Sequence, residues 1–211
     1  RGNRKSFEKA FAGIVKTLSL SGRKPGISVF CTITEWNIGH LAQFAEIFRH
    51  IPLQHLGFMH TNFTPQYVAD AHNQLYGNLY PATDSSMEGI SIESMNLNQL
   101  LEDIRQIKKM GLSFPVSFSP ELDTRASLEI FYRQPEKLIG KTCNNAFQTI
   151  MVKSDGSVIP AHGRCYNITA GNMYQQSLKE IWNSTVLARF RKTLMEAGGL
   201  LPACSRCCSA F

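Results

Sequence analysis

The chain contains the run Pro202-Ala203-Cys204-Ser205-Arg206-Cys207-Cys208, which closes a cysteine-rich segment that begins at Cys143. Cys165 lies between these two points, so the segment holds all but one of the six cysteines. Two thiolates in a C-x-x-C loop can hold one metal ion or one iron of a cluster, and two more from distant positions complete four-fold sulfur ligation. The pattern therefore predicts a metal centre with the ligands Cys143, Cys165, Cys204 and Cys207.

Spacing alone leaves three interpretations of these cysteines open: a 4Fe–4S cluster, a structural zinc ion, or reduced thiols that pack in a core. Residues 141–211 are too few for a large core of their own, and units of this size often need a metal to fold. A metal centre is thus favoured over packed thiols, but zinc and a cluster are not separated. Cys208 is either an alternative ligand or a neighbouring thiol, and the second interpretation is favoured.

The composition is that of a folded protein without a membrane segment. Of 211 residues, 43% are hydrophobic and 18% are charged, and no apolar run approaches the length of about 20 residues needed to cross a bilayer. The net charge of +6 is spread along the chain rather than gathered in a stripe, so nucleic-acid binding is not expected. The vicinal pair Cys207-Cys208 is poorly placed for two disulfides, which favours a reduced, cytoplasmic protein.

Helical and strand patterns alternate in the first two thirds of the chain. Apolar periodicity predicts helices over 7–18, 38–49, 97–107 and 125–133, with a further helix opening at Thr64-Pro65. Short β-branched or apolar runs predict strands over 27–33, 56–60 and 114–118. This alternation predicts an α/β fold with a parallel sheet, and three strands are too few to close a barrel, so we expect a partial (β/α) barrel.

The pattern changes near Gly140, where we place a domain boundary between residues 1–140 and 141–211. A hairpin is predicted from Phe147–Val152 to Ser157–Ile159 around the turn Asp155-Gly156. A capping box at Ser177–Glu180 predicts a helix, and another helical stretch with Leu187, Phe190 and Leu194 follows it. The second domain is therefore expected to be a small α+β unit.

Several motifs of this unit occur in a familiar order and spacing. They are Cys143, Ser154–Pro160, Gly171-Asn172-Met173, Ser177–Asn183, Phe190-Arg191 and Pro202–Cys208. Together they resemble the SPASM/twitch extension of radical S-adenosylmethionine (SAM) enzymes. The resemblance implies one auxiliary 4Fe–4S cluster of twitch type, ligated fully by cysteine.

The first part of the chain resembles the radical SAM barrel from just after its third strand, through Arg1–Ile14 and Ile27–Asn37. The family motif C-x-x-x-C-x-x-C, which holds the SAM-cleaving cluster, is absent, and Cys31 is the one cysteine before Cys143. Cys31 is expected to be a core thiol. We therefore expect a truncated piece of a longer enzyme, rather than a degenerate homologue, that does not itself cleave SAM.

For the intact parent enzyme, the resemblance implies SAM, a second 4Fe–4S cluster and a 5′-deoxyadenosyl radical that abstracts a substrate hydrogen. It also implies a peptide or small-molecule substrate and an electron donor such as a flavodoxin or ferredoxin. The alternative class is a zinc-stabilised structural or binding module without a redox role. The sequence leaves open whether this chain is itself an enzyme.

Other polar residues are weaker candidates. Thr34 and Asn37 follow the end of a predicted strand, where they would either contact SAM or substrate or simply hold the loop. Arg164 and Arg206 adjoin predicted ligands and could offset cluster charge, although surface positions are favoured for both. His60 closes a predicted strand and is expected to be a structural histidine with its hydrogen bonds satisfied.

Overall fold

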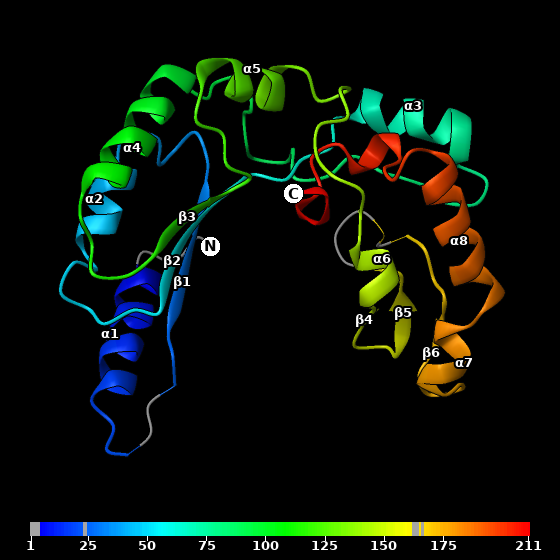
Figure 1. Cartoon of the computed structure of the whole chain (residues 1–211), viewed down its shortest axis with the longest axis horizontal. Coiled ribbons are helices and arrows are strands. Elements are labelled where there is room, and N and C mark those ends of the chain that lie inside the picture. The colour runs from blue at the N-terminus through cyan, green and yellow to red at the C-terminus, as the bar shows by residue number, and fades with distance from the viewer. Residues whose placement is uncertain (1–4, 23–24, 162–164, 166) are drawn as a thin grey trace.

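The computed structural model describes residues 5–22, 25–161, 165 and 167–211 (Figure 1). Its first part is built on the strands β1 (Ser28–Ile33), β2 (His55–His60) and β3 (Val116–Ser119). They form one sheet in the order β1-β2-β3, and both neighbouring pairs are parallel. The predicted parallel sheet is thus confirmed, and its strands do not close into a barrel within the described residues.

Helices cover one face of this sheet (Figure 1). They are α1 (Ser6–Leu18), α2 (Leu41–Glu46) and α4 (Leu97–Lys109), while α5 (Arg125–Arg133) and α3 (Gln66–Tyr76) lie beyond the end of the sheet. In α4 the apolar side chains that recur every three or four residues are all buried, as the periodicity predicts. Asn96 begins this helix by accepting the Gln99 N–H, and Thr124 begins α5 through a capping box with Ser127.

The two faces of the sheet differ in burial. Ile33, Phe58 and Phe118 point toward the helices and belong to the main hydrophobic core. On the opposite face Phe30 is 58% exposed and Met59 is also exposed. A parallel sheet usually has both faces covered, so this open face is an unusual feature of the fold.

Three predicted elements differ from the observed ones. The helix predicted over 38–49 is only α2, because Gly39 has a φ of +92° and the preceding residues form turns. Pro65 lies at the N-cap of α3 rather than in its first turn. Phe147 belongs to the short helix α6 (Asn145–Gln148), where a strand was predicted, and the adjacent Ala146 is completely buried.

The hairpin turn is confirmed. The antiparallel strands β4 (Met151–Val152) and β5 (Ser157–Ile159) flank Gly156, whose φ is +78°. Asp155 fixes the turn by accepting hydrogen bonds from the N–H and hydroxyl of Ser157. A third short strand, β6 (Gly171–Asn172), pairs with β5 and was not predicted.

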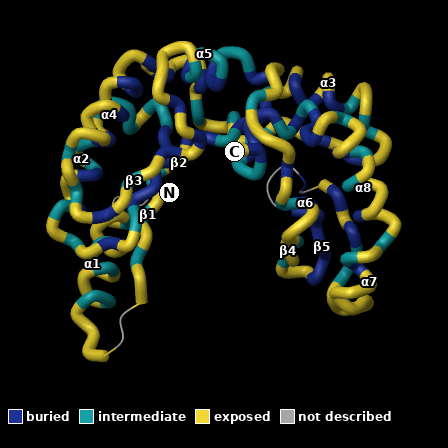
Figure 2. The backbone as a smooth tube through the Cα atoms, viewed as in Figure 1, coloured by how far each residue is buried: buried dark blue, intermediate teal, exposed yellow. Residues whose placement is uncertain are grey.

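The remaining helices complete the second part. They are α7 (Leu178–Trp182), α8 (Thr185–Glu196) and the 3₁₀ turns η2 (Pro202–Cys204) and η3 (Cys208–Ala210). The capping box of Ser177 with Glu180 begins α7, as predicted. In Figure 2 the buried stretches of this part lie along β5 and the inner side of α8. Across the described ranges, no helix is both long and apolar enough to cross a membrane.

His60 closes β2 and is almost completely buried beside α5. Its Nδ1 lies 2.7 Å from the Tyr132 hydroxyl, and its Nε2 has no hydrogen-bond partner among the described residues. The expectation of a fully satisfied histidine is therefore wrong for one ring nitrogen. Burial lowers the pKa of His60 from 6.5 to about 3, because a charged ring would lose its hydration.

This buried histidine predicts a pH-dependent stability. Between pH 6.5 and 3 the unfolded chain binds a proton at His60 that the folded chain does not, so acid favours unfolding. In urea titrations, the unfolding free energy of the wild type should fall by up to about 1.4 kcal/mol per pH unit more steeply than that of His60→Gln. Equal slopes in the two proteins would contradict a depressed pKa.

Candidate metal centre

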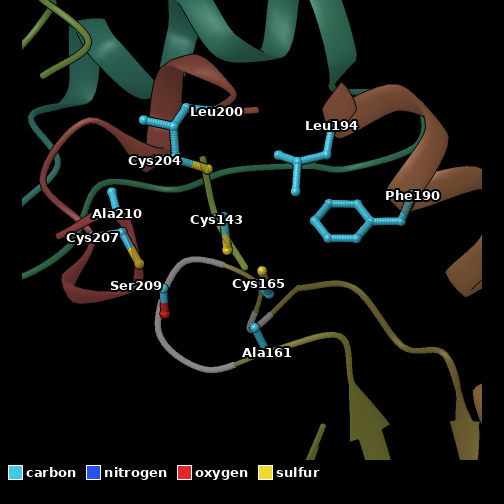
Figure 3. A pocket seen from close by; sticks show the side chains of 10 residues that line it. All are labelled: Cys143, Ala161, Cys165, Phe190, Leu194, Leu200, Cys204, Cys207, Ser209 and Ala210. Atoms are coloured by element: carbon cyan, nitrogen blue, oxygen red, sulfur yellow. The ribbon is translucent and has the colours of Figure 1, made fainter. Parts of the chain in front are cut away.

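Four cysteine thiols line one cavity in the second part of the chain (Figure 3). They come from separate segments: Cys143 precedes α6, Cys165 follows β5, and Cys204 and Cys207 flank the turn after η2. Figure 3 shows the four sulfur atoms directed toward the same space. The structure thus brings together the four residues that the sequence singled out as ligands.

The rest of the cavity wall is almost entirely apolar. Phe190 and Leu194 on α8 form one side, and Leu200 and the small residues Ala161 and Ala210 complete it, with Ser209 as the polar exception. Apolar walls keep water from the thiols and lower the local dielectric constant. The site is therefore suited to a group bound by sulfur rather than to a hydrated ion.

A close crossing of backbone segments positions Cys143. Its N–H donates to the Gly199 carbonyl at 3.1 Å, and the Lys141 N–H donates to the Ala210 carbonyl at 2.6 Å. Gly199 has a φ of +98°, and a Cβ there would lie 2.6 Å from Thr142 Oγ1. Only glycine therefore allows the turn after α8 to approach residues 142–143 this closely.

His72 on α3 supports the loop that carries Cys204. Its Nε2 donates to the Tyr80 carbonyl at 2.6 Å, so Nδ1 is the acceptor for the Ala203 N–H at 3.4 Å. Both bonds are buried, and burial lowers the pKa of His72 so that the ring is neutral. The neutral ring thus joins η2 to α3, a contact that no sequence motif indicated.

Arg206 is completely buried, so the expectation of a surface arginine is wrong. Its guanidinium donates five hydrogen bonds, all to backbone carbonyl oxygens. Any residue type can provide a backbone carbonyl, and for that reason no sequence motif indicates this contact. Arg164, the other arginine considered beside the ligands, lies outside the described residues.

The thiols influence one another electrostatically. Burial raises the pKa of Cys165, and the neighbouring thiols of Cys204, Cys207 and Cys143 raise it further. Burial also raises the pKa of Cys143, with a smaller contribution from Cys207. Cys143 and Cys165 are therefore neutral thiols near pH 7 when no metal is bound, and binding of a metal to them must release protons.

The arrangement can be compared with what a single ion needs. Within the part of the chain that the structure describes, no three His, Cys, Asp or Glu side chains lie close enough together to hold one metal ion. The cavity between the thiols is small, with a volume of about 10 Å³. The fit to an iron–sulfur cluster therefore rests on the donor set, four thiols in apolar surroundings, which is the ligation that such clusters take.

The other candidate cysteines lie outside the cavity lining. Cys208 is half-buried and forms side-chain hydrogen bonds with Cys207 and Asn62, the first of which does most to raise its pKa. Cys31 lies on β1 against the main core, as expected, and burial raises its pKa to about 11. None of the six cysteines forms a disulfide.

Asn37 holds the loop after β1. Its Oδ1 accepts the Thr34 N–H at 2.9 Å, and its Nδ2 donates to the Thr32 carbonyl at 2.8 Å. Neither Thr34 nor Asn37 is among the described residues that line the thiol cavity. Contact of these two residues with SAM or substrate stays a prediction.

Comparison with known proteins agrees with this site. Residues 143–208 match the model of the SPASM family, described as an iron–sulfur cluster-binding domain. The matched range begins at the first thiol of the cavity and ends just after the last. No curated protein matches the chain, and no solved structure does. The family match indicates an iron–sulfur cluster-binding module at the C-terminal side of the α/β part.

The role of His72 can be tested by His72→Phe, which keeps the ring volume but leaves the Tyr80 carbonyl and the Ala203 N–H without partners. Urea unfolding of the metal-free protein should show a loss of roughly 2–4 kcal/mol. His50→Phe is the matched control, since His50 is exposed and should change stability by less than about 0.5 kcal/mol. Similar stabilities of the two variants would show that the ring merely fills space.

Proposed function

We propose that this chain binds one 4Fe–4S cluster through Cys143, Cys165, Cys204 and Cys207. The observation that carries the proposal is the meeting of four thiols, from segments far apart in the sequence, at one apolar cavity. The match of residues 143–208 to an iron–sulfur domain family supports it independently. Because the twitch arrangement holds one cluster, four cysteine ligands account for the whole site.

The family match and the lack of a three-ligand site among the described residues favour a cluster over zinc. All four ligands of a zinc ion lie about 2.3 Å from one point, whereas each iron of a 4Fe–4S cluster takes one thiolate, so the four sulfurs stand farther apart. The described side chains surround a space and offer no three-ligand site for a single ion. Zinc therefore becomes the outcome that would overturn the proposal.

The residues of the site would have different roles in binding such a group. The thiolates would bind it, and Phe190 and Leu194 would exclude water. His72 and Arg206 hold residues 202–208, the ligand loop, in place. A cluster bound here would supply one-electron transfer, and burial and hydrogen bonds to sulfur set its potential. Cys208 forms a side-chain hydrogen bond with Cys207 and would therefore help to set this potential.

We further propose that the module serves a radical SAM-type enzyme. In support, parallel βα units precede the module, and Asn62, just after β2, contacts Cys208 beside the ligand Cys207. Open α/β folds place their ligands at the carboxyl ends of the strands, so a substrate there would lie near the thiol cavity. The corresponding reaction would use SAM and a second 4Fe–4S cluster, act on a peptide or small molecule, and draw electrons from a flavodoxin or ferredoxin.

Anaerobic reconstitution with iron and sulfide tests the cluster directly. We expect about four irons and four sulfides per chain and a broad visible charge-transfer band. The same protein offered zinc and iron together should retain iron. A colourless protein with one zinc per chain would instead identify a structural zinc site.

Cysteine variants test the ligand set. Replacing any one of Cys143, Cys165, Cys204 or Cys207 by Ala should reduce bound iron at least several-fold, because one iron would lose its thiolate. Cys31→Ala is the matched control, since Cys31 lies in the main core and should not affect loading. Cys208→Ala should also load fully. Loss of the cluster in that variant, with retention in Cys207→Ala, would move the fourth ligand to Cys208.

A further inference from the structure

Arg206 stands between two proposed ligands, yet its side chain reaches away from them to the first part of the chain. Its Nη2 donates to the carbonyls of Ile130 and Gln134, at 2.7 and 2.8 Å. Its Nη1 donates to the carbonyl of Lys137 at 2.9 Å and to that of Ser205 at 2.7 Å, and its Nε donates to Phe131. All five N–H groups of the guanidinium are thereby used.

Three of these acceptors, the carbonyls of Ile130, Phe131 and Gln134, lie at the end of α5, where a helix leaves its carbonyl groups without partners. Ile130 and Phe131 lie in the last turn of α5, Gln134 is its C-cap, and Lys137 belongs to the linker that leads toward Cys143. The last carbonyls of a helix lack partners within the helix, and the C-terminal end of its dipole favours a cation. The Arg206 guanidinium also lies 5.1 Å from the centre of the Phe131 ring. The Arg206 side chain, which comes from the ligand loop, therefore satisfies the carbonyl groups at the C-terminal end of α5.

The burial of Arg206 makes this contact cooperative. The side chain is completely buried, and desolvation lowers its pKa to about 10. If the ligand loop moved away, four carbonyls at and just after the α5 end and the buried cation would lose their hydrogen bonds at once. Displacement of the loop is therefore coupled to disruption of the helix end. Lysine could not replace it, because an ammonium has three donors and lacks the planar fork.

We propose that Arg206 couples the ligand loop to the end of α5, so that ordering of Cys204 and Cys207 and ordering of residues 130–137 form one linked equilibrium. Arg206 is then a positioning residue for the cluster, and this inference rests on the proposed function only for the identity of the bound group. Linkage is reciprocal, so a ligand that fixes the thiols must also stabilise the α5 end. No thiol lies on α5 itself, and Arg206 is the side chain of the C-x-x-C loop that hydrogen-bonds to the end of this helix.

Arg133 provides a matched control. It is the last residue of α5. Its guanidinium donates hydrogen bonds to the backbone carbonyls of Ile92, Glu93 and Met95. It therefore resembles Arg206 in chemistry and location but does not contact the ligand loop through these bonds. Arg133→Met should lower stability without breaking the coupling, whereas Arg206→Met should break it.

The first readout needs no cluster. In the iron-free full-length chain, alkylation of Cys207 should be at least tenfold faster in Arg206→Met than in the wild type or Arg133→Met, with Cys143 changed much less. Arg206→Lys, which keeps the cation and fewer hydrogen bonds, should fall between the wild type and Arg206→Met. It also keeps the test decisive if the methionine variant does not fold, which circular dichroism would reveal. Unchanged alkylation in a folded Arg206→Met or Arg206→Lys would overturn the coupling.

The second readout is hydrogen exchange in residues 130–137 before and after anaerobic iron–sulfide loading. Loading should slow exchange there at least tenfold in the wild type and in Arg133→Met, and much less in Arg206→Lys. Equal slowing in all three proteins would overturn the coupling. If the wild type takes up no iron, the proposed function fails, while the alkylation rates still decide whether Arg206 holds the ligand loop.

Discussion

Desolvation of four thiols in one apolar cavity is the constraint on which the second part of the chain depends. Neutral thiols pack like small hydrophobic groups, and Cys143 and Cys165 share a core with Phe190, Leu194 and Ala146. As thiolates the same groups would repel one another and lose hydration, as the raised pKa of Cys165 shows. The site is therefore compact without a metal and can carry charge only when a cationic centre compensates it. This property suits a module that folds around an iron–sulfur cluster.

The first part of the chain supports this cavity from outside. His72 joins η2 to α3, and Arg206 joins the ligand loop to α5, so two helices of the α/β part hold the two cysteines of the C-x-x-C loop. Each contact satisfies backbone groups that burial would otherwise leave unpaired. The loop with Cys204 and Cys207 is therefore packed against both parts of the chain. The domain boundary at residue 140 stays a prediction.

Much of the fold could be predicted because its signals are local. The periodic apolar residues of α4, the capping box of α7 and the Asp155-Gly156 turn each depend on a few neighbouring residues, and all are confirmed. Phe147 was misassigned because burial of Ala146 outweighs an alternating pattern. The roles of His72 and Arg206 could not be predicted, since their partners are backbone groups far away in sequence. The gathering of Cys143, Cys165, Cys204 and Cys207 followed from residue type and spacing, because few other chemistries need such thiols.

The position of Arg206 in the sequence also has a consequence for biosynthesis. A ribosome releases α3, α5 and the strands of both sheets before it releases Cys204, Arg206 and Cys207. Until then the end of α5 lacks the hydrogen bonds from Arg206, and Cys143 and Cys165 lack the other two thiols of the cavity. The segment that carries Cys204, Arg206 and Cys207 therefore completes the set of four thiols and supplies the hydrogen bonds to the end of α5 at the same stage of synthesis.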